Sequence, residues 1–224
     1  MNGTGREGPA MRCRMRFGRR SGAAAGAAGH LGRIKELRAL VAGSGLAYYG
    51  SRGPAAGQPK MAFGPAGGAG HENLCEYADA WFSRLYREEE LRAALSPGTA
   101  GLELAALKRV PLLFPSIEAS SAAAGFELRF DPVPPDAGSR LREFLASARF
   151  MAEREKKSGK VLFDLRPAVV SASWKGSSLS ALLRLRAGGR PETLASVLYG
   201  AAPAAVLRRE LYWEDSSGNF REIL

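Results

Sequence analysis

The side chains best suited to chemistry are few in this sequence, and they lie far apart. The 224 residues include two cysteines, Cys13 and Cys75, and two histidines, His30 and His71. Two distant cysteines exclude a disulfide-rich scaffold, a CxxC zinc site and an iron–sulfur cluster held by cysteines of this chain alone. The histidines and scattered acids show no metal-ligand spacing, so we expect no bound metal.

His30 is a candidate for acid–base catalysis. It precedes an expected helix and lies near Arg33 and Lys35, whose charges disfavour the protonated imidazole and so suit a general base. Such a residue could cleave RNA, or it could simply cap or pack at the helix start. The sequence contains no GxSxG motif, and the Gly/Ala stretch at 22–29 lacks the Gly-Lys-Ser/Thr ending of a phosphate loop.

Basic residues are concentrated at the start of the chain. The formal net charge is +10, and residues 1–70 hold 11 Lys and Arg against two acids, Glu7 and Glu36. A concentrated positive potential attracts phosphates or an acidic protein face, whereas a basic tail beside a solvated helix face binds neither. The candidate RNA- or partner-binding residues are Arg12, Arg14, Arg16, Arg19, Arg20, His30, Arg33, Tyr48, Arg52, Lys60, Lys157, Lys160 and Arg166.

Three of these cations share one expected strand. Residues 11–17 (MRCRMRF) alternate between apolar side chains and arginines, which predicts a half-buried strand with Arg12, Arg14 and Arg16 on its other face. Tyr48 lies near the Gly-rich loops, where it could stack on an unpaired base or pack against the core. Lys160 lies by an expected hairpin turn, where lysines also serve as solvated edge residues.

The hydrophobic pattern predicts the elements that position these residues. We expect an α+β fold of two packed ferredoxin-like (split βαβ) lobes with antiparallel sheets. The expected strands are 11–17, 60–63, 76–84, 101–109, 125–131, 149–156, 160–166, 178–187 and 205–213, and the expected helices are 31–42, 87–95, 137–148 and 191–199. The expected domains are a disordered tail at 1–10, an N-terminal lobe at 11–109 with Gly-rich loops, a C-terminal lobe at 110–213 and a tail at 214–224.

The remaining features concern location. No window contains the roughly 18 consecutive apolar residues of a membrane helix. The basic N-terminus lacks the sustained apolar segment of a secretory signal, and cysteines are scarce, so we expect a cytoplasmic protein.

A series of motifs follows the order seen in one bacterial family. These are MRCRMRF at 11–17, GHL at 29–31, KMAFGPA at 60–66, EYAD at 76–79, VPL at 110–112, PSI at 115–117, FLA at 144–146, KKSGKV at 156–161, DLRP at 164–167 and LRLRAGGRPE at 183–192. Over residues 11–213 the chain resembles the radical SAM-linked protein family, a domain of unknown function. Its members are encoded beside a radical SAM protein or fused to its C-terminus.

The chain departs from that family at two places. The family's Ser-His-Leu-Asp reads Gly29-His30-Leu31-Gly32 here, so the carboxylate is missing. The family's Gly-Phe-Asn-Pro-His-Pro loop is replaced by GPAAGQP at 53–59, with Gln58 near the histidine position. If those polar residues form an active site in relatives, this chain has lost part of it. If they only shape a loop, function survives.

The resemblance implies a radical SAM protein as partner. It also implies a non-catalytic accessory or substrate-binding role, in which the basic residues would suit RNA as the substrate. A radical SAM enzyme needs three cysteines for its cluster, so this chain cannot be that enzyme. We therefore expect no cofactor on this chain, and assign S-adenosylmethionine and the iron–sulfur cluster to the partner. The alternatives are a stand-alone RNA-binding module and a His-dependent ribonuclease-like enzyme.

Overall fold

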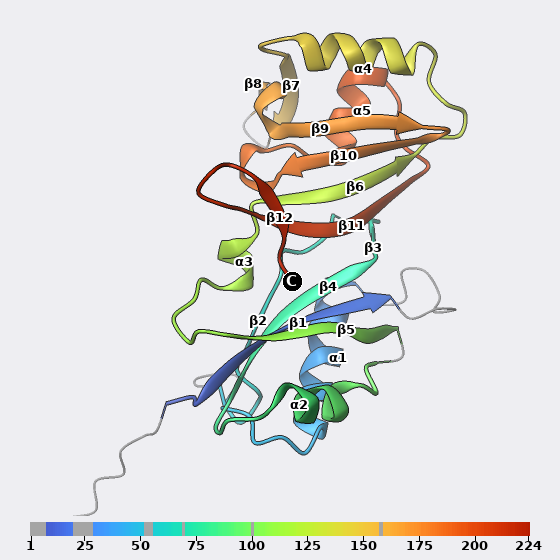
Figure 1. The fold of residues 1–224 in the computed structure, drawn as a ribbon. Coiled ribbons are helices and arrows are strands. Elements are labelled where there is room, and N and C mark those ends of the chain that lie inside the picture. Colours follow the sequence, from blue (N-terminus) through green and yellow to red (C-terminus); the bar gives the residue numbers. More distant parts are fainter. Residues whose placement is uncertain (1–7, 20–28, 52–55, 69, 100, 157–158) are drawn as a thin grey trace, which may run out of the picture. The chain divides into compact units, whose positions relative to one another are not determined.

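The protein is α+β, as its sequence predicts. The computed structural model describes residues 8–19, 29–51, 56–68, 70–99, 101–156 and 159–224. Over these residues it contains five α-helices and three β-sheets (Figure 1). Contacts divide the chain into unit 1, which is Met1–Ala66, Cys75–Ser120 and Leu224, and unit 2, which is Gly67–Leu74 and Ser121–Ile223. Among the described helices, none is long and apolar enough to cross a membrane.

Unit 1 is a four-stranded antiparallel sheet whose two longer helices pack on one face. The strand order is β2 (Met61–Phe63), β4 (Cys75–Phe82), β1 (Met11–Arg19) and β5 (Leu102–Val110). Helix α1 (His30–Gly43) follows β1, and α2 (Glu88–Leu95) follows β4. The short helix α3 (Ile117–Ser120) ends the unit's second segment.

The alternation in β1 explains why the two helices pack where they do. Met11, Cys13, Met15 and Phe17 all lie on one face of the strand, and they form a buried core with Leu37 and Val41 of α1 and Leu91 and Leu95 of α2. Burial raises the pKa of the Cys13 thiol to about 12. The thiol is therefore protonated at neutral pH, and it has neither the exposure nor the thiolate character of a nucleophile.

Unit 2 has a larger sheet. The strand order is β12 (Phe220–Glu222), β11 (Ala205–Glu214), β6 (Ala123–Arg129), β10 (Ser178–Arg184) and β9 (Val169–Lys175), and the short β3 (Glu72–Asn73) pairs with β11. Helix α4 (Ala137–Ala146) follows β6, and α5 (Pro191–Tyr199) follows β10. Strand β12 lies within the 214–224 segment expected to be a tail.

The expected hairpin forms, but it does not belong to the main sheet. Strands β7 (Met151–Lys156) and β8 (Gly159–Asp164) pair only with each other among the described strands. The strand beside β10 is instead β9, which the sequence analysis missed. Its sequence, VVSASWK, begins two residues after Pro167 and mixes serines with apolar residues, a pattern that also fits a loop.

Candidate functional site

One face of the unit 1 sheet gathers positive charge. In the antiparallel ladders Arg12 lies opposite Trp81 and Val110, Arg14 opposite Asp79 and Lys108, and Arg16 opposite Tyr77 and Ala106. Directly opposite residues place their side chains on the same face, here the face away from α1 and α2. Lys60 adjoins these rows, because the Trp81 amide donates to the Lys60 carbonyl at 3.1 Å. We call Arg12, Arg14, Arg16, Lys60, Tyr77, Asp79, Trp81 and Lys108 the cationic face.

At the centre of the cationic face lies a buried ion cluster. The Asp79 side chain is fully buried, and its carboxylate accepts from Arg12 Nη2 at 2.5 Å and from Arg14 Nε at 2.8 Å. It also accepts the backbone N–H of Ile117 at 3.1 Å. The Nη2 atoms of Arg12 and Arg14, which both contact Asp79, also donate to the Pro115 carbonyl oxygen, at 2.9 and 3.0 Å. The cluster therefore ties β1, β4 and the 114–117 segment together.

This burial corrects the half-buried strand expected at 11–17. Arg12 and Arg14 are each only 2% exposed. The alternation correctly separates the arginines from the apolar side chains, but it cannot reveal that the 114–120 segment provides acceptors above them. Arg16 is half-buried on the same face. Burying two guanidiniums requires charge and hydrogen-bond partners, which Asp79 and the carbonyls supply.

Beside the cluster, cations and aromatic rings alternate. Arg12 Cζ lies 4.7 Å from the centre of the Trp81 ring, and Lys60 Nζ lies 4.9 Å from the same ring. Lys60 Nζ is also 5.7 Å from the centre of the Tyr49 ring. Trp81 and Tyr49 are half-buried and Lys60 is exposed, so this edge offers both ring surface and a mobile ammonium group.

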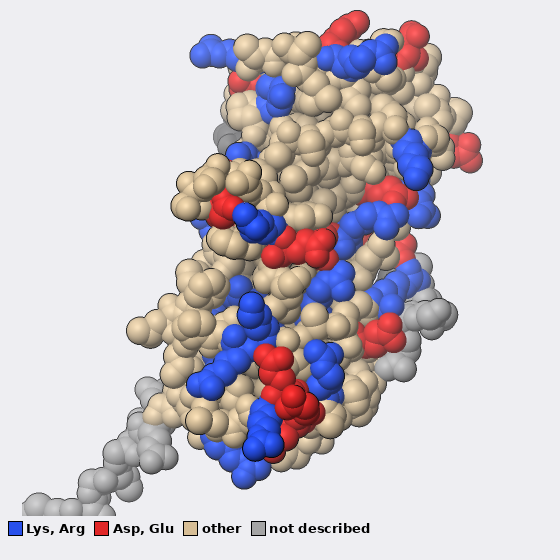
Figure 2. Space-filling view, viewed as in Figure 1, with Lys and Arg blue, Asp and Glu red and all other residues tan. Residues whose placement is uncertain are grey.

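Charge on the cationic face is strongly unbalanced. Five cations, namely Arg12, Arg14, Arg16, Lys60 and Lys108, share this sheet face with the buried carboxylate of Asp79, and the strand register also places Glu103 there, opposite Gly18. Over α2 and β5, by contrast, Figure 2 shows basic and acidic side chains intermixed. Helix α2 begins with Glu88, Glu89 and Glu90, where carboxylates favour the helix dipole. The surplus of positive charge is thus a property of one sheet face, which suits a polyanionic ligand.

A comparison with known protein families identifies the family of this chain. The profile of a family described as an uncharacterized protein conserved in bacteria (DUF2344) matches residues 12–194. The chain belongs to this family. The match begins at Arg12 and includes every residue of the cationic face. The DUF2344 description states no activity and no partner, and no curated protein matches the chain.

The structure brings only some of the predicted binding residues together. Arg12, Arg14, Arg16 and Lys60 share the cationic face, and Arg19 is the last residue of β1. Arg33 pairs locally with Glu36 at 3.0 Å, and the Tyr48 hydroxyl donates to the Gly57 carbonyl at 3.0 Å. Lys160 and Arg166 belong to unit 2. Arg20, Arg52 and Lys157 lie outside the described residues.

In unit 2 the predicted cations have local partners. Lys160 pairs with Glu153 at 3.2 Å on the hairpin. The sequence spacing of Asp164 and Arg166, two residues apart on one expected strand, is compatible with a local ion pair, but the side chains have other partners. Asp164 instead accepts the backbone N–H groups of Phe150 at 2.9 Å and Arg166 at 3.0 Å, while the Arg166 guanidinium donates to the Val169 carbonyl at 2.8 Å. These contacts order the 164–169 segment.

The two histidines lie in different units. His30 is the first residue of α1, and its buried Nδ1 has no hydrogen-bond partner among the described residues, so no acceptor or donor orients the ring there as a base. His71 is held in unit 2, where its Nδ1 accepts the Gly68 N–H at 3.1 Å and its Nε2 contacts the Glu192 carboxylate. The described residues contain no group of three or more metal-ligating side chains.

Asp79, Trp81 and Lys108 were missed as site residues. A signal was present for the first two, because EYADAWF at 76–82 places Tyr77, Asp79 and Trp81 at alternate positions of one strand. Recognising their importance required the register, which sets Asp79 directly opposite Arg14. Lys108 required the pairing of β5 with β1, which strand prediction alone does not supply.

Proposed function

We propose that this chain is a non-catalytic accessory module that binds RNA and works with a separate radical SAM protein. The observation that carries the RNA component is the cationic face, where five cations surround the buried carboxylate of Asp79 next to the Trp81 and Tyr49 rings. The partner component rests on the family resemblance and on the two widely spaced cysteines, which cannot hold a radical SAM cluster.

We also propose that each unit is a ferredoxin-like lobe. In unit 1 the first strand, β1, lies between β4 and β5, and β2 lies outside β4. In unit 2, β6 correspondingly lies between β10 and β11, and β9 lies outside β10. In unit 1, α1 follows β1 and α2 follows β4. In unit 2, α4 follows β6 and α5 follows β10. The repeated order supports the proposal, because it is the order that a split βαβ unit produces.

The chemistry of the cationic face suits single-stranded RNA. Bases of any sequence stack on aromatic rings, and each such stack contributes about 1–3 kcal/mol. Phosphates are attracted by the exposed Lys60 and Lys108. Arg12 and Arg14 already donate hydrogen bonds to Asp79 and to the Pro115 carbonyl. Arg12 therefore serves to position the Trp81 ring, and both arginines add to the local positive potential.

The test is equilibrium binding of a fluorescently labelled single-stranded RNA of about 12 nucleotides, at several salt concentrations. We expect Trp81→Leu to weaken binding by about 5- to 150-fold, the equivalent of one lost base stack. Lys60→Ala is expected to lower the slope of log affinity against log salt by about 0.7, because one phosphate contact is lost.

Matched controls come from unit 2. Trp213 is 40% exposed and Lys175 is exposed, so Trp213→Leu and Lys175→Ala are expected to leave RNA affinity unchanged. Thermal unfolding of each variant verifies that it is folded. The RNA proposal is wrong if the wild-type chain binds no RNA, or if the control variants lose as much affinity as Trp81→Leu and Lys60→Ala.

A further inference from the structure

A short segment of unit 1 displays apolar side chains to solvent. Leu113 is 97% exposed, Leu112 40% and Phe114 46%. They form a turn between Pro111 and Pro115, closed by the Phe114 N–H, which donates to the Pro111 carbonyl at 3.0 Å. We call Leu112, Leu113 and Phe114 the apolar loop. Adjacent large apolar residues on a protein surface mark interaction sites more often than single ones do.

The apolar loop is held firmly in place. The carbonyl oxygen of Phe114 accepts from Arg12 Nη1, and that of Pro115 accepts from both Arg12 and Arg14. The Arg14 guanidinium also lies over the Phe114 ring, 5.5 Å from its centre. Both arginines are anchored by the buried Asp79. The exposed side chains are therefore presented by a fixed backbone, and a partner that binds them loses little loop entropy.

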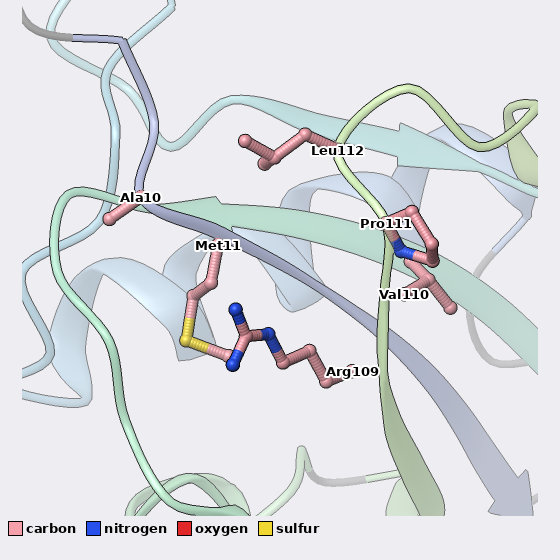
Figure 3. Close-up of a pocket in the computed structure, with 6 residues that line it drawn as sticks. All are labelled: Ala10, Met11, Arg109, Val110, Pro111 and Leu112. Atoms are coloured by element: carbon pink, nitrogen blue, oxygen red, sulfur yellow. The ribbon is translucent and has the colours of Figure 1, made fainter.

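A groove lies at the base of this loop. It has a volume of about 490 Å³ and is lined by Ala10, Met11, Arg109, Val110, Pro111 and Leu112. Figure 3 shows the Met11 and Arg109 side chains converging, with Leu112 lying apart from them. Among the described residues that line it, Arg109 is charged and the other five are apolar, and polar and apolar atoms contribute equally to the exposed lining. The groove therefore suits an apolar side chain that carries, or lies beside, a carboxylate.

We infer that the apolar loop and this groove form the docking surface for a partner protein, and that the partner presents an apolar pocket with an acidic rim. A projecting, fixed loop beside a concave groove requires a surface of matching shape, which a folded protein has and a fluid bilayer lacks. The charge of Arg109 selects carboxylates on that surface. This inference rests on the proposed function, since it identifies the partner as the radical SAM protein.

The test is co-expression of the full chain with a radical SAM protein from the same organism, followed by affinity measurement on the purified pair. We expect Leu113→Asp to weaken the complex by at least about tenfold, because it places a charge in the apolar pocket. Arg109→Glu should weaken it by charge reversal. Leu113 is almost fully exposed, so neither the fold nor the RNA affinity of Leu113→Asp should change. The control is Leu162→Asp on the unit 2 hairpin, where Leu162 is 65% exposed.

The outcomes separate the two proposals. If the wild-type chain does not bind the radical SAM protein, the accessory role itself fails. If the wild-type chain binds and Leu113→Asp binds equally well, only the docking surface is wrong. The docking inference is also overturned if Leu113→Asp abolishes self-association in analytical ultracentrifugation, or binding to vesicles containing anionic lipid, while the radical SAM complex is unaffected.

Discussion

Replacing Asp79 by Asn removes the buried carboxylate at the centre of the cationic face while preserving the shape of the side chain. In the wild-type protein this group accepts two donors from Arg14, one from Arg12 and the Ile117 N–H. In Asp79→Asn one oxygen becomes an NH₂ donor that points at guanidinium donors. Two arginines that are each 2% exposed then lack a counter-ion.

The expected destabilisation is large because the cluster is buried. Removing one partner of a buried ion pair costs about 3–5 kcal/mol, since it leaves an uncompensated charge in a medium of low dielectric constant. The loss of stability is expected in unit 1, because Asp79 and its donors Arg12, Arg14 and Ile117 all belong to that unit. For local opening, a loss of 3–5 kcal/mol corresponds to roughly 150- to 5,000-fold faster amide exchange.

Hydrogen exchange followed by mass spectrometry measures this effect strand by strand. We expect faster exchange in peptides from β1 and β4 and unchanged exchange in peptides from β6 and β10 of unit 2. The matched control is Glu103→Gln, which neutralises an exposed carboxylate on β5 and should change stability by at most about 0.5 kcal/mol. If β1 and β4 exchange equally slowly in Asp79→Asn and Glu103→Gln, the reasoning about the cluster is refuted.

The remaining predictions concern pH. Burial raises the pKa of Cys13 from 9.0 to about 12, so unfolding releases a proton between these values and the free energy of unfolding should fall as pH rises from 9 towards 12. Urea unfolding of Cys13→Ala should show a shallower decline over that range, and an identical decline would contradict this assignment. In unit 2, hydrogen bonds from Arg129 and then Arg209 lower the pKa of Glu127 below 4.5, so its stabilising effect is present above pH 4.5 and is lost as pH falls through the lowered value. Glu127→Gln should therefore lower the free energy of unfolding by about 1 kcal/mol at pH 7, a modest value because both arginines are half-exposed. In strong acid the variant and the wild-type protein should be almost equally stable. An equal loss of stability at pH 7 and pH 2 would disprove this prediction.

Local patterns in the sequence predict much of this fold. The alternation in MRCRMRF correctly indicates β1 and its apolar face, and Pro191 correctly marks the start of α5. Both signals are local, because side-chain period and proline geometry act within a few residues. Strand β9 was missed because serines interrupt its apolar pattern. Strand β3 was missed because its two residues are too few to show an alternating hydrophobic pattern.

The candidate site was harder to predict than the strands. Arg12, Arg14, Arg16 and Lys60 were selected by charge, and they do share one face. Their environment depends on contacts between distant residues: Arg14 with Asp79, and Arg12 with the carbonyls near Pro115. Sequence separation hides such contacts, so the burial of Arg12 and Arg14 and the importance of Trp81 emerge only from the register of the strands.

Ultraviolet cross-linking of bound RNA to the full chain, with the cross-linked peptides identified by mass spectrometry, shows whether RNA binds at the cationic face. We expect cross-links in peptides that contain Tyr49 and Trp81, and we expect Lys60→Ala to lose them at moderate salt. Cross-links confined to unit 2, or none at all from a folded chain mixed with excess RNA, would contradict the assignment of the cationic face as an RNA-binding surface.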